Sequence, residues 1–321
     1  VQIYLSGGFR DFVSSPITLS DTGANQGIAL GDVDGNGSLD LIVANGGGQP
    51  DMVYANDGAA NFSAVATLGN SFGQDVAVSD FDGDGNLDIA VAAIGGNPIY
   101  RGNGNGTFSL QGTLGNANSR AVAVGALDTS SVDDLVFANV GSASRVWVFN
   151  NSGNWFASRA LLAIGDAAAV TIGSFGGDAL DDLAFARIPA AIGDVPANPV
   201  LVNTGNGTFG APLSLLGTAP TSDIFAGNVN DIDGAGLDDL VFVNSSGVHQ
   251  IWVANGSGFD LHDEQIADSD SITGVIAELG MTDVGEPGGL DLAMGGAIQS
   301  GIGVFLNDGF GNLGRGDAVA P

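Results

Sequence analysis

Two short loops of the sequence place carboxylates at a spacing that suits the binding of calcium. The more regular of them, residues 80–88, reads DFDGDGNLD, with carboxylates at loop positions 1, 3, 5 and 9 and glycines at positions 4 and 6. Calcium takes about six to eight oxygen ligands, and alternate side chains of a tightly turned loop can supply them. Glycine allows the positive φ of such a turn because it carries no Cβ. Without a cation, carboxylates this close repel each other and raise one another's pKa.

The same pattern occurs 48 residues earlier, where residues 32–40 read DVDGNGSLD. We call residues 32–40 the first loop and residues 80–88 the second loop. The predicted ligands of the first loop are the side chains of Asp32, Asp34, Asn36 and Asp40 and the carbonyl of Ser38. Those of the second loop are the side chains of Asp80, Asp82, Asp84 and Asp88 and the carbonyl of Asn86. The alternative for each loop is a solvated Asp/Gly-rich turn, and the recurrence of the pattern favours a metal site.

Four later loops keep less of this pattern. The third loop (126–134) has lost its first carboxylate and its glycines, and the fourth loop (174–182) keeps only the later carboxylates. Both are expected to be turns whose final Asp caps a strand or bonds backbone amides. For the fifth loop a site of altered geometry and a plain turn both stay open, with Asn228, Asn230, Asp231, Asp233 and Asp239 as the candidate ligands. The sixth loop (278–291) is interrupted by Pro287, and no metal is assigned to it.

Composition restricts the partners of the chain. Its 321 residues include 33 Asp, 3 Glu, 7 Arg and no Lys, which gives a formal net charge of −29. A nucleic-acid partner needs a basic surface and is therefore excluded. Direct binding to anionic lipid is disfavoured, and no apolar run approaches the ~20 residues that span a bilayer. Millimolar calcium is an extracellular condition, so we expect a secreted or cell-surface location without membrane insertion.

Internal repeats organise the whole chain. Each unit consists of an apolar segment, an Asp-rich loop, an Asp-apolar pair that opens a second apolar segment, and a hairpin with a tight Asn/Gly turn. The Asp-apolar pair marks six units, at Asp40, Asp88, Asp134, Asp182, Asp239 and Asp291. An aromatic residue follows the tight turn at Phe62, Phe108, Phe156, Phe209 and Phe259, and Leu313 takes that place in the last unit.

The repeats predict an all-β chain folded as a β-propeller. Four short strands in each repeat of ~50 residues, rich in Val, Ile and Phe, are typical of an antiparallel blade, and radial packing of blades buries both faces. We expect one domain over residues 1–321, with a partial blade at 1–20 and successive repeats at about 21–69, 70–115, 116–164, 165–217, 218–268 and 269–321. The prediction is seven blades with an incomplete first or last blade; the alternative is six blades with an extra N-terminal hairpin.

These motifs carry a family resemblance. An apolar-Gly-Asp-x-Asp-Gly-Asn-Gly-x-x-Asp-Leu pattern around the first loop, followed by an Asn-Gly-x-Phe turn, resembles the FG-GAP/VCBS repeat. That repeat builds the propeller of integrin α-subunits and of many bacterial surface and secreted proteins. The resemblance implies a propeller that binds ligands through loops on one face or at its central channel.

The chain lacks an obvious catalytic constellation. It has two histidines, His249 and His262, no Cys and no Lys, and no nucleophile elbow or phosphate-binding loop. We therefore predict no catalytic residues and no enzyme activity. The leading hypothesis is an extracellular, calcium-stabilised module that binds or adheres to a glycan or a surface protein. The alternatives are a structural subunit of a surface filament or sheath, completed by other copies or chains, and the propeller domain of a secreted polysaccharide-degrading enzyme.

Overall fold

The computed structural model describes most of the chain. The described residues are 1–3, 6–8, 11–12, 17–19, 23–69, 71–150, 155–178, 180–189, 197–217, 219–227, 237–245, 248–255, 257–261, 271–277, 291–296, 302–307 and 313–315. They contain strands and turns and no helix, which confirms the prediction of an all-β chain. The described part of the chain therefore has no helix with the length and apolarity needed to span a bilayer.

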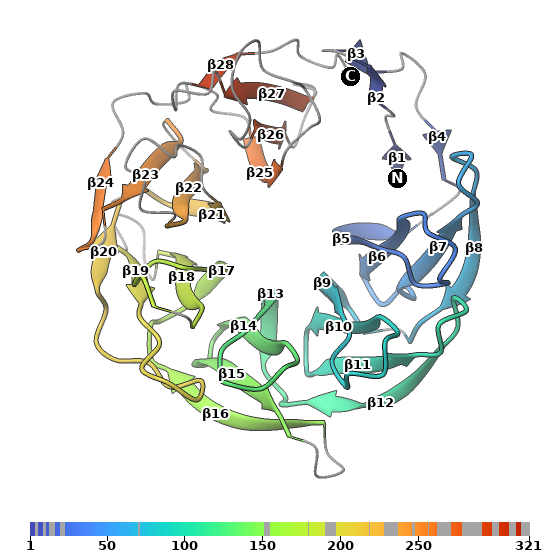
Figure 1. Cartoon of the computed structure of the whole chain (residues 1–321), viewed down its shortest axis with the longest axis horizontal. Helices are drawn as coiled ribbons and strands as arrows, with labels where there is room; N and C mark the ends of the chain where they lie inside the picture. The colour runs from blue at the N-terminus through green and yellow to red at the C-terminus, as the bar shows by residue number, and fades with distance from the viewer. Residues whose placement is uncertain are drawn as a thin grey trace. The chain divides into compact units, whose positions relative to one another are not determined.

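Each sequence repeat forms a four-stranded antiparallel sheet, and six such sheets are described (Figure 1). Within each sheet the strands lie side by side in chain order. The first sheet contains β5 (Ala24–Gly31), β6 (Asp40–Gly46), β7 (Met52–Asn56) and β8 (Phe62–Thr67). The second contains β9 (Gly73–Ser79), β10 (Asp88–Ala93), β11 (Asn97–Gly102) and β12 (Phe108–Leu114). The third contains β13 (Asn118–Gly125), β14 (Asp134–Val140), β15 (Ser144–Phe149) and β16 (Phe156–Leu162).

The remaining three sheets repeat the same order. The fourth sheet contains β17 (Ala167–Gly173), β18 (Asp182–Arg187), β19 (Asn198–Leu201) and β20 (Ser214–Leu216). The fifth contains β21 (Thr221–Gly227), β22 (Asp239–Asn244), β23 (Gln250–Ala254) and β24 (Phe259–Leu261). The sixth contains β25 (Ser271–Ala277), β26 (Asp291–Gly296), β27 (Ile302–Asn307) and β28 (Leu313–Arg315). The second strand of every sheet thus begins at the Asp of an Asp-apolar pair.

Residues before the first sheet form two short strand pairs. β1 (Gln2–Ile3) pairs with β4 (Ile17–Thr18), and β2 (Ser6–Gly8) pairs with β3 (Asp11–Phe12), both antiparallel. The strand pairs agree with the expected N-terminal hairpin. Whether they belong to a seventh blade or supplement six blades remains a prediction.

The chain divides into two compact units. Unit 1 comprises Val1, Leu19–Ala167 and Thr204–Phe209, and unit 2 comprises Gln2–Thr18, Ala168–Asn203 and Gly210–Pro321. In unit 1, β9 contacts both β5 and β13, so the first strands of three successive sheets are neighbours (Figure 1). In unit 2, β21 contacts β25, the first strand of the sixth sheet, and β18, the second strand of the fourth sheet.

Strand position within a sheet explains the hydrophobic pattern. Every residue of β6 and of β10 is buried, because a second strand has sheet neighbours on both sides and is covered on both faces. A strand buried on both faces reads as a continuous apolar run instead of an alternating one. The fourth strands β8 and β12 are edge strands and are mostly exposed or half-buried.

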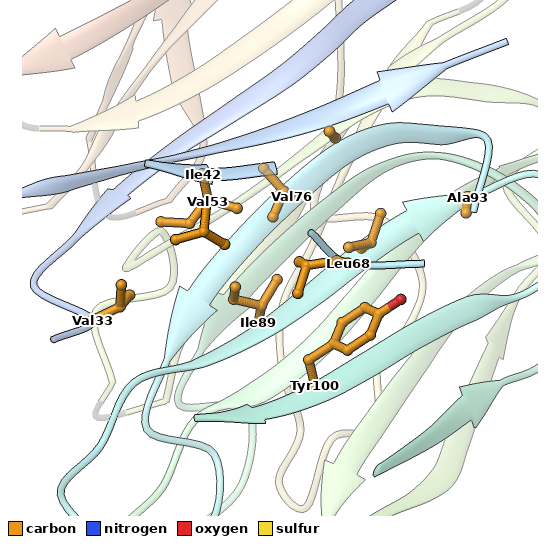
Figure 2. Close-up of a cluster of buried hydrophobic side chains, with 10 residues drawn as sticks. Val33, Ile42, Val53, Leu68, Val76, Ile89, Ala93 and Tyr100 are labelled. Atoms are coloured by element: carbon orange, nitrogen blue, oxygen red, sulfur yellow. The ribbon is translucent and has the colours of Figure 1, made fainter. Parts of the chain in front are cut away.

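Apolar side chains from adjacent sheets fill the space between them. Figure 2 shows Val33, Ile42 and Val53 from the first sheet and its loop packed with Val76 and Ile89 from the second. An analogous cluster joins the second and third sheets, where the ring of Phe81 meets that of Phe156 edge-on at a centroid distance of 5.5 Å. Burial of each large aliphatic side chain contributes about 1.5–3 kcal/mol.

One face of the first sheet departs from this arrangement. Ile28 and Leu30 on β5 are each 59% exposed. Leu30 pairs across the sheet with Leu41 as Val78 pairs with Ile89, so Leu30 and Val78 occupy equivalent positions. Val78 packs against the cluster between the first and second sheets, whereas Leu30 is exposed. This face of β5 therefore has the residues of an intersheet contact.

Candidate metal centres

The final Asp of the loop pattern forms the same backbone hydrogen bond in the first five sheets, whose final Asp side chains are described. Its Oδ1 atom accepts a hydrogen bond from the amide of the last residue of the third strand or, in the fourth sheet, from the amide of the second residue after that strand. The donor amides lie 2.7–3.0 Å away and belong to Asn56 for Asp40, Gly102 for Asp88, Phe149 for Asp134, Asn203 for Asp182 and Ala254 for Asp239. All five aspartates are buried. This contact, which we call the aspartate clamp, ties the second strand of a sheet to its third.

The first loop brings three carboxylates together. Asp32, Asp34 and Asp40 each offer an oxygen atom, and these atoms lie within 4.8 Å of one another. Asp32 accepts hydrogen bonds from the amides of Gly35 and Gly37 at 2.9 and 2.8 Å, which fixes the turn. The Oδ1 atom of Asn36 accepts from the amide of Ser38 at 2.8 Å. The loop thus gathers oxygen atoms around one point at the start of β6.

The second loop repeats this geometry. Asp80, Asp82 and Asp88 each offer an oxygen atom, again within 4.8 Å of one another. Asp80 accepts from the amides of Gly83 and Gly85, both at 2.8 Å. The Oδ1 atom of Asp84 accepts from the amide and the side-chain nitrogen of Asn86, both at 2.8 Å. Asp84 is therefore held beside the three-carboxylate cluster and is not one of its members.

Glycine is required at two positions of each loop. Gly35 and Gly37 have φ values of 75° and 87°, and Gly83 and Gly85 have values of 73° and 88°. Side chains other than glycine adopt this left-handed region at a cost. The glycines let consecutive amides point at the first Asp, so the loop is already turned around its carboxylates.

The second loop perturbs the ionisation of its acids. Burial raises the pKa of Asp88 to about 7; the amides of Gly102 and Phe81 oppose this rise, and the nearby charges of Asp82 and Asp84 add to it. Burial also raises the pKa of Asp82, with the charge of Asp84 as the next cause. A bound cation would reverse these effects, because an adjacent positive charge favours the ionised form.

A basic residue that sequence reasoning missed lies against the second loop. The guanidinium Nε and Nη2 atoms of Arg101, on β11, lie 2.9 Å from Asp82 Oδ2 and 2.6 Å from Asp84 Oδ2. The hydrogen bond from the amide of Asn86 and the contact with Arg101 lower the pKa of Asp84. The sequence signal is visible once the repeats are aligned on the aspartate clamp. The residue before the clamp's amide donor is then Ala55, Arg101, Val148, Val202 and Val253 in successive sheets.

The tight turn of one sheet also contacts the loop of the preceding sheet. The amide of Gly106, between β11 and β12, donates to the carbonyl of Val33 in the first loop at 3.1 Å. The amide of Gly207 donates to the carbonyl of Leu127 in the third loop at 2.7 Å, in the part of the chain that belongs to unit 1. In the first and third loops, the second residue thus has a buried side chain and a carbonyl that accepts a hydrogen bond from the tight turn of the next sheet.

The other predicted loops divide into those with turn contacts and those outside the described residues. In the third loop Asp134 forms the aspartate clamp, and in the fourth loop Asp182 also accepts from the amides of Phe175 and Gly176 at 3.0 and 2.6 Å. These contacts are the backbone bonds expected of a final Asp in a turn. Of the fifth loop only Asp239 is described, with Leu237 and Asp238 beside it; residues 228–236, including Asn228, Asn230, Asp231 and Asp233, lie outside the described part, as does the sixth loop before Asp291.

Calcium fits the donor chemistry of the first two loops. Both clusters supply oxygen atoms alone, and hard divalent cations prefer such ligands. Softer transition metals favour imidazole or thiolate, which neither cluster contains. In both loops, backbone amides already donate hydrogen bonds to the first Asp, so the turn is formed before an ion binds.

Comparison with known proteins identifies the class. A chain from the structure of an Agrocybe aegerita lectin, described as specifically recognising non-reducing terminal N-acetylglucosamine, matches with a TM-score of 0.58 and 17% identity, over 93% of this chain and 81% of the lectin chain. A chain from the crystal structure of BBS1N in complex with ARL6DN matches with a TM-score of 0.57 and 12% identity, over 86% of this chain and 76% of that one. At these identities the likeness concerns the fold. No curated protein matches the sequence.

The sheets and these neighbours define the chain as a β-propeller protein. Two overlapping segments, residues 32–91 and 80–131, match the model of the FG-GAP-like repeat. The matched segments include both carboxylate loops and the strands that follow them in the first two sheets. The predicted family resemblance is confirmed.

Proposed function

We propose that the chain is a calcium-stabilised propeller that acts as an extracellular binding module. The observation that carries the proposal is the pair of three-carboxylate clusters at equivalent positions of two successive FG-GAP-like repeats. A cluster of this kind in one turn is common on acidic surfaces, but the same geometry at the same register in two repeats argues for a shared ligand. FG-GAP-like repeats are typical of extracellular proteins, which supports the proposed location.

Calcium would be held by each cluster together with nearby loop oxygens. In the first loop these are Asp32, Asp34 and Asp40, with Asn36 and the Ser38 carbonyl as further donors; in the second they are Asp80, Asp82 and Asp88, with Asp84 and the Asn86 carbonyl. The bound ion supplies positive charge that offsets the repulsion among carboxylates. The chain's own contribution is rigidity, since the aspartate clamp and the glycine turns fix three oxygens before any ion arrives.

The metal part of the proposal is tested by titrating calcium-stripped protein by isothermal calorimetry. The expected result is saturable binding, lost from the first loop in Asp32→Asn/Asp34→Asn and from the second in Asp80→Asn/Asp82→Asn. Asp178→Asn in the fourth loop, which removes one exposed carboxylate outside either cluster, is the matched control. A number of bound calcium ions that neither double substitution reduces would contradict the assignment.

For the ligand, we propose a glycan, bound without catalysis. The similarity to a glycan-recognising lectin supports this class at the level of fold. The acidic composition favours partners that are neutral, cationic or bridged by calcium. Within the described residues the one histidine, His249, is buried and accepts from the amide of Asn244 at 3.0 Å, which is a structural contact. A glycan array run with and without calcium tests the proposal, and turnover of a polysaccharide without stable binding would favour the enzyme alternative.

A second candidate function is assembly with other copies of the chain. The observation that favours it is the exposed face of β5, where Ile28 and Leu30 carry the residues of an intersheet contact. A second copy that packs on this face would bury both side chains. Sedimentation or light scattering of the wild type and of Ile28→Asp/Leu30→Asp tests this candidate. A monomeric wild type across the micromolar range would remove it.

A further inference from the structure

One basic side chain makes the two carboxylate loops unequal. We propose that Arg101 is a tethered counter-cation that competes with calcium for the second loop, so that the second loop binds calcium more weakly and exchanges it more readily than the first. The inference rests on the calcium binding proposed above. It assigns a role to a residue outside the loop pattern.

The contact geometry supports competition at the ligands themselves. Arg101 spans two carboxylates of the loop, with Nε 2.9 Å from Asp82 Oδ2 and Nη2 2.6 Å from Asp84 Oδ2. Asp82 is a member of the three-carboxylate cluster, so the guanidinium forms an ion pair with a group that calcium would also use. A carboxylate oxygen shared with a guanidinium is less available to a metal, because its charge is already neutralised.

The first loop provides the internal comparison. At the position of Arg101 the first sheet has Ala55, since Asn56 and Gly102 are the equivalent amide donors of the aspartate clamp. At loop position 5 the first loop has neutral Asn36 where the second has Asp84. The first loop therefore holds three carboxylates, and the second holds four with one guanidinium, so each carries a net formal charge of −3. The second loop thus has one more carboxylate than the first and a cation that offsets it, so the two loops differ in the guanidinium held at the carboxylates and not in net charge.

The guanidinium also lies near an aromatic ring outside the second loop. The Cζ atom of Arg101 lies 6.0 Å from the ring centroid of Trp155, which precedes β16 in the third sheet. A guanidinium near an indole ring gains cation–π attraction at about this distance. The Arg101 side chain is 44% exposed, so it has room to leave the carboxylates while keeping the contact with Trp155. Calcium at the second loop would then exchange one cation for another.

The experiment measures calcium affinity at the second loop alone. Every protein compared carries Asp32→Asn/Asp34→Asn, which is expected to abolish calcium binding at the first loop, and Arg101→Gln is added to this background. The expected result is calcium affinity higher by about three- to tenfold in the Arg101→Gln protein, since partly exposed charge pairs are individually weak. Arg101→Lys retains the charge and should remain within about twofold of the background protein, on the same reasoning.

The matched control is Arg145→Gln. Arg145 lies on β15 with its Cζ 5.4 Å from the ring centroid of Trp147, so this change removes the same charge and a similar ring contact in a sheet without a carboxylate cluster among the described residues. Calcium affinity is expected to stay unchanged. Thermal unfolding of every variant without calcium confirms folding, and the first loop, measured in Asp80→Asn/Asp82→Asn, reports separately on the proposed function.

The outcomes separate the two proposals. If the first loop binds calcium and Arg101→Gln leaves the second loop's affinity unchanged or lower, Arg101 does not compete and the inference fails alone. An equal gain in Arg145→Gln would also overturn it, because the effect would then follow from net charge. If neither loop binds calcium in any variant, the proposed metal function fails.

Discussion

The loops of the first four sheets each end in an aspartate, but those of the first two sheets differ from those of the third and fourth in their earlier residues. In all four, the final Asp is buried and accepts a hydrogen bond from a backbone amide at or within two residues of the end of the third strand. In the first two alone, among the described loops, two further carboxylates converge on it. The comparison teaches that the final Asp serves the fold in every one of these loops, and that it also becomes part of a candidate metal site only where the earlier acids are present. A loop can therefore lose its metal ligands and still build its sheet.

The largest expected effect of a single substitution is on a clamp in a loop without a metal cluster. Asp182 accepts from the amides of Phe175, Gly176 and Asn203, so Asp182→Ala leaves three buried or half-buried donors unpaired. We expect the free energy of unfolding to fall by about 2–4 kcal/mol, because each buried unsatisfied group is costly. Urea unfolding with and without calcium is the measurement. A loss that requires calcium would break the distinction between clamp and metal site.

Among the loops that the structure describes, calcium removal should act on the first two. At a free concentration of about 100 times Kd, each occupied site stabilises the folded state by about 2.7 kcal/mol. A chelator should therefore lower the melting temperature of the wild type. Asp34→Asn should reduce this shift, and Asp178→Asn in the fourth loop should leave it unaltered. Calorimetric melting curves with and without chelator check this, and an unchanged wild-type melting temperature would be decisive against stabilisation by calcium.

The free energy of unfolding should also depend on pH, because the Asp134 carboxyl that forms the aspartate clamp of the third sheet titrates. Burial raises the pKa of Asp134 to about 7, although the amide of Phe149 opposes the rise. The folded state then holds a proton on Asp134 over a range in which the unfolded state has lost it. This contribution is present below the unfolded pKa of 3.8 and is lost as pH rises toward about 7. The slope from this group is at most about 1.4 kcal/mol per pH unit.

Asp134→Asn should flatten that dependence, because the amide does not titrate. Calcium-free protein unfolded in urea at several values between pH 4 and pH 8 provides the measurement. Equal pH dependence in the wild type and in Asp134→Asn would show that the Asp134 carboxyl ionises normally in the folded protein.

The smallest effect concerns the glycine turns. Gly85 has a φ of 88° and a Cβ built on it meets nothing within 4 Å, so Gly85→Ala tests backbone strain without a steric clash. The expected cost is about 1 kcal/mol of unfolding free energy. Gly207 has a φ of 64°, and its Cβ would lie 2.8 Å from Val148 Cγ1, so Gly207→Ala should cost more. Equal costs would mean that the turn relaxes around the added methyl group.

Much of the fold could be predicted from sequence because its signals are local and repeated. The Asp-apolar pair marks the first residue of the second strand in all six sheets, and continuous apolar runs after it correspond to buried central strands. The ligands that cluster, Asp32, Asp34 and Asp40 with their counterparts, follow from spacing within nine residues. Such contacts need no knowledge of the tertiary structure.

The remainder depended on contacts between segments distant in sequence. Arg101 meets Asp84 from 17 residues away, and the amide of Asn203 meets Asp182 from 21 residues away. No spacing rule within a loop predicts either pair. Alignment of the repeats would have exposed Arg101 as the charged exception among Ala55 and three valines. The clamp could not have been found this way, since its donor is a backbone amide and leaves no side-chain signature.

The hydrogen bond from Gly106 to Val33 gives the first loop a dependence on its neighbour. The second repeat supplies this hydrogen bond. A fragment that ended after β8 would therefore contain every predicted ligand of the first loop but lack the backbone contact that holds the loop from outside. The smallest autonomous calcium-binding piece of this protein is then a tandem of two repeats. The first loop would then gain its full set of backbone contacts only once the second repeat has folded against it.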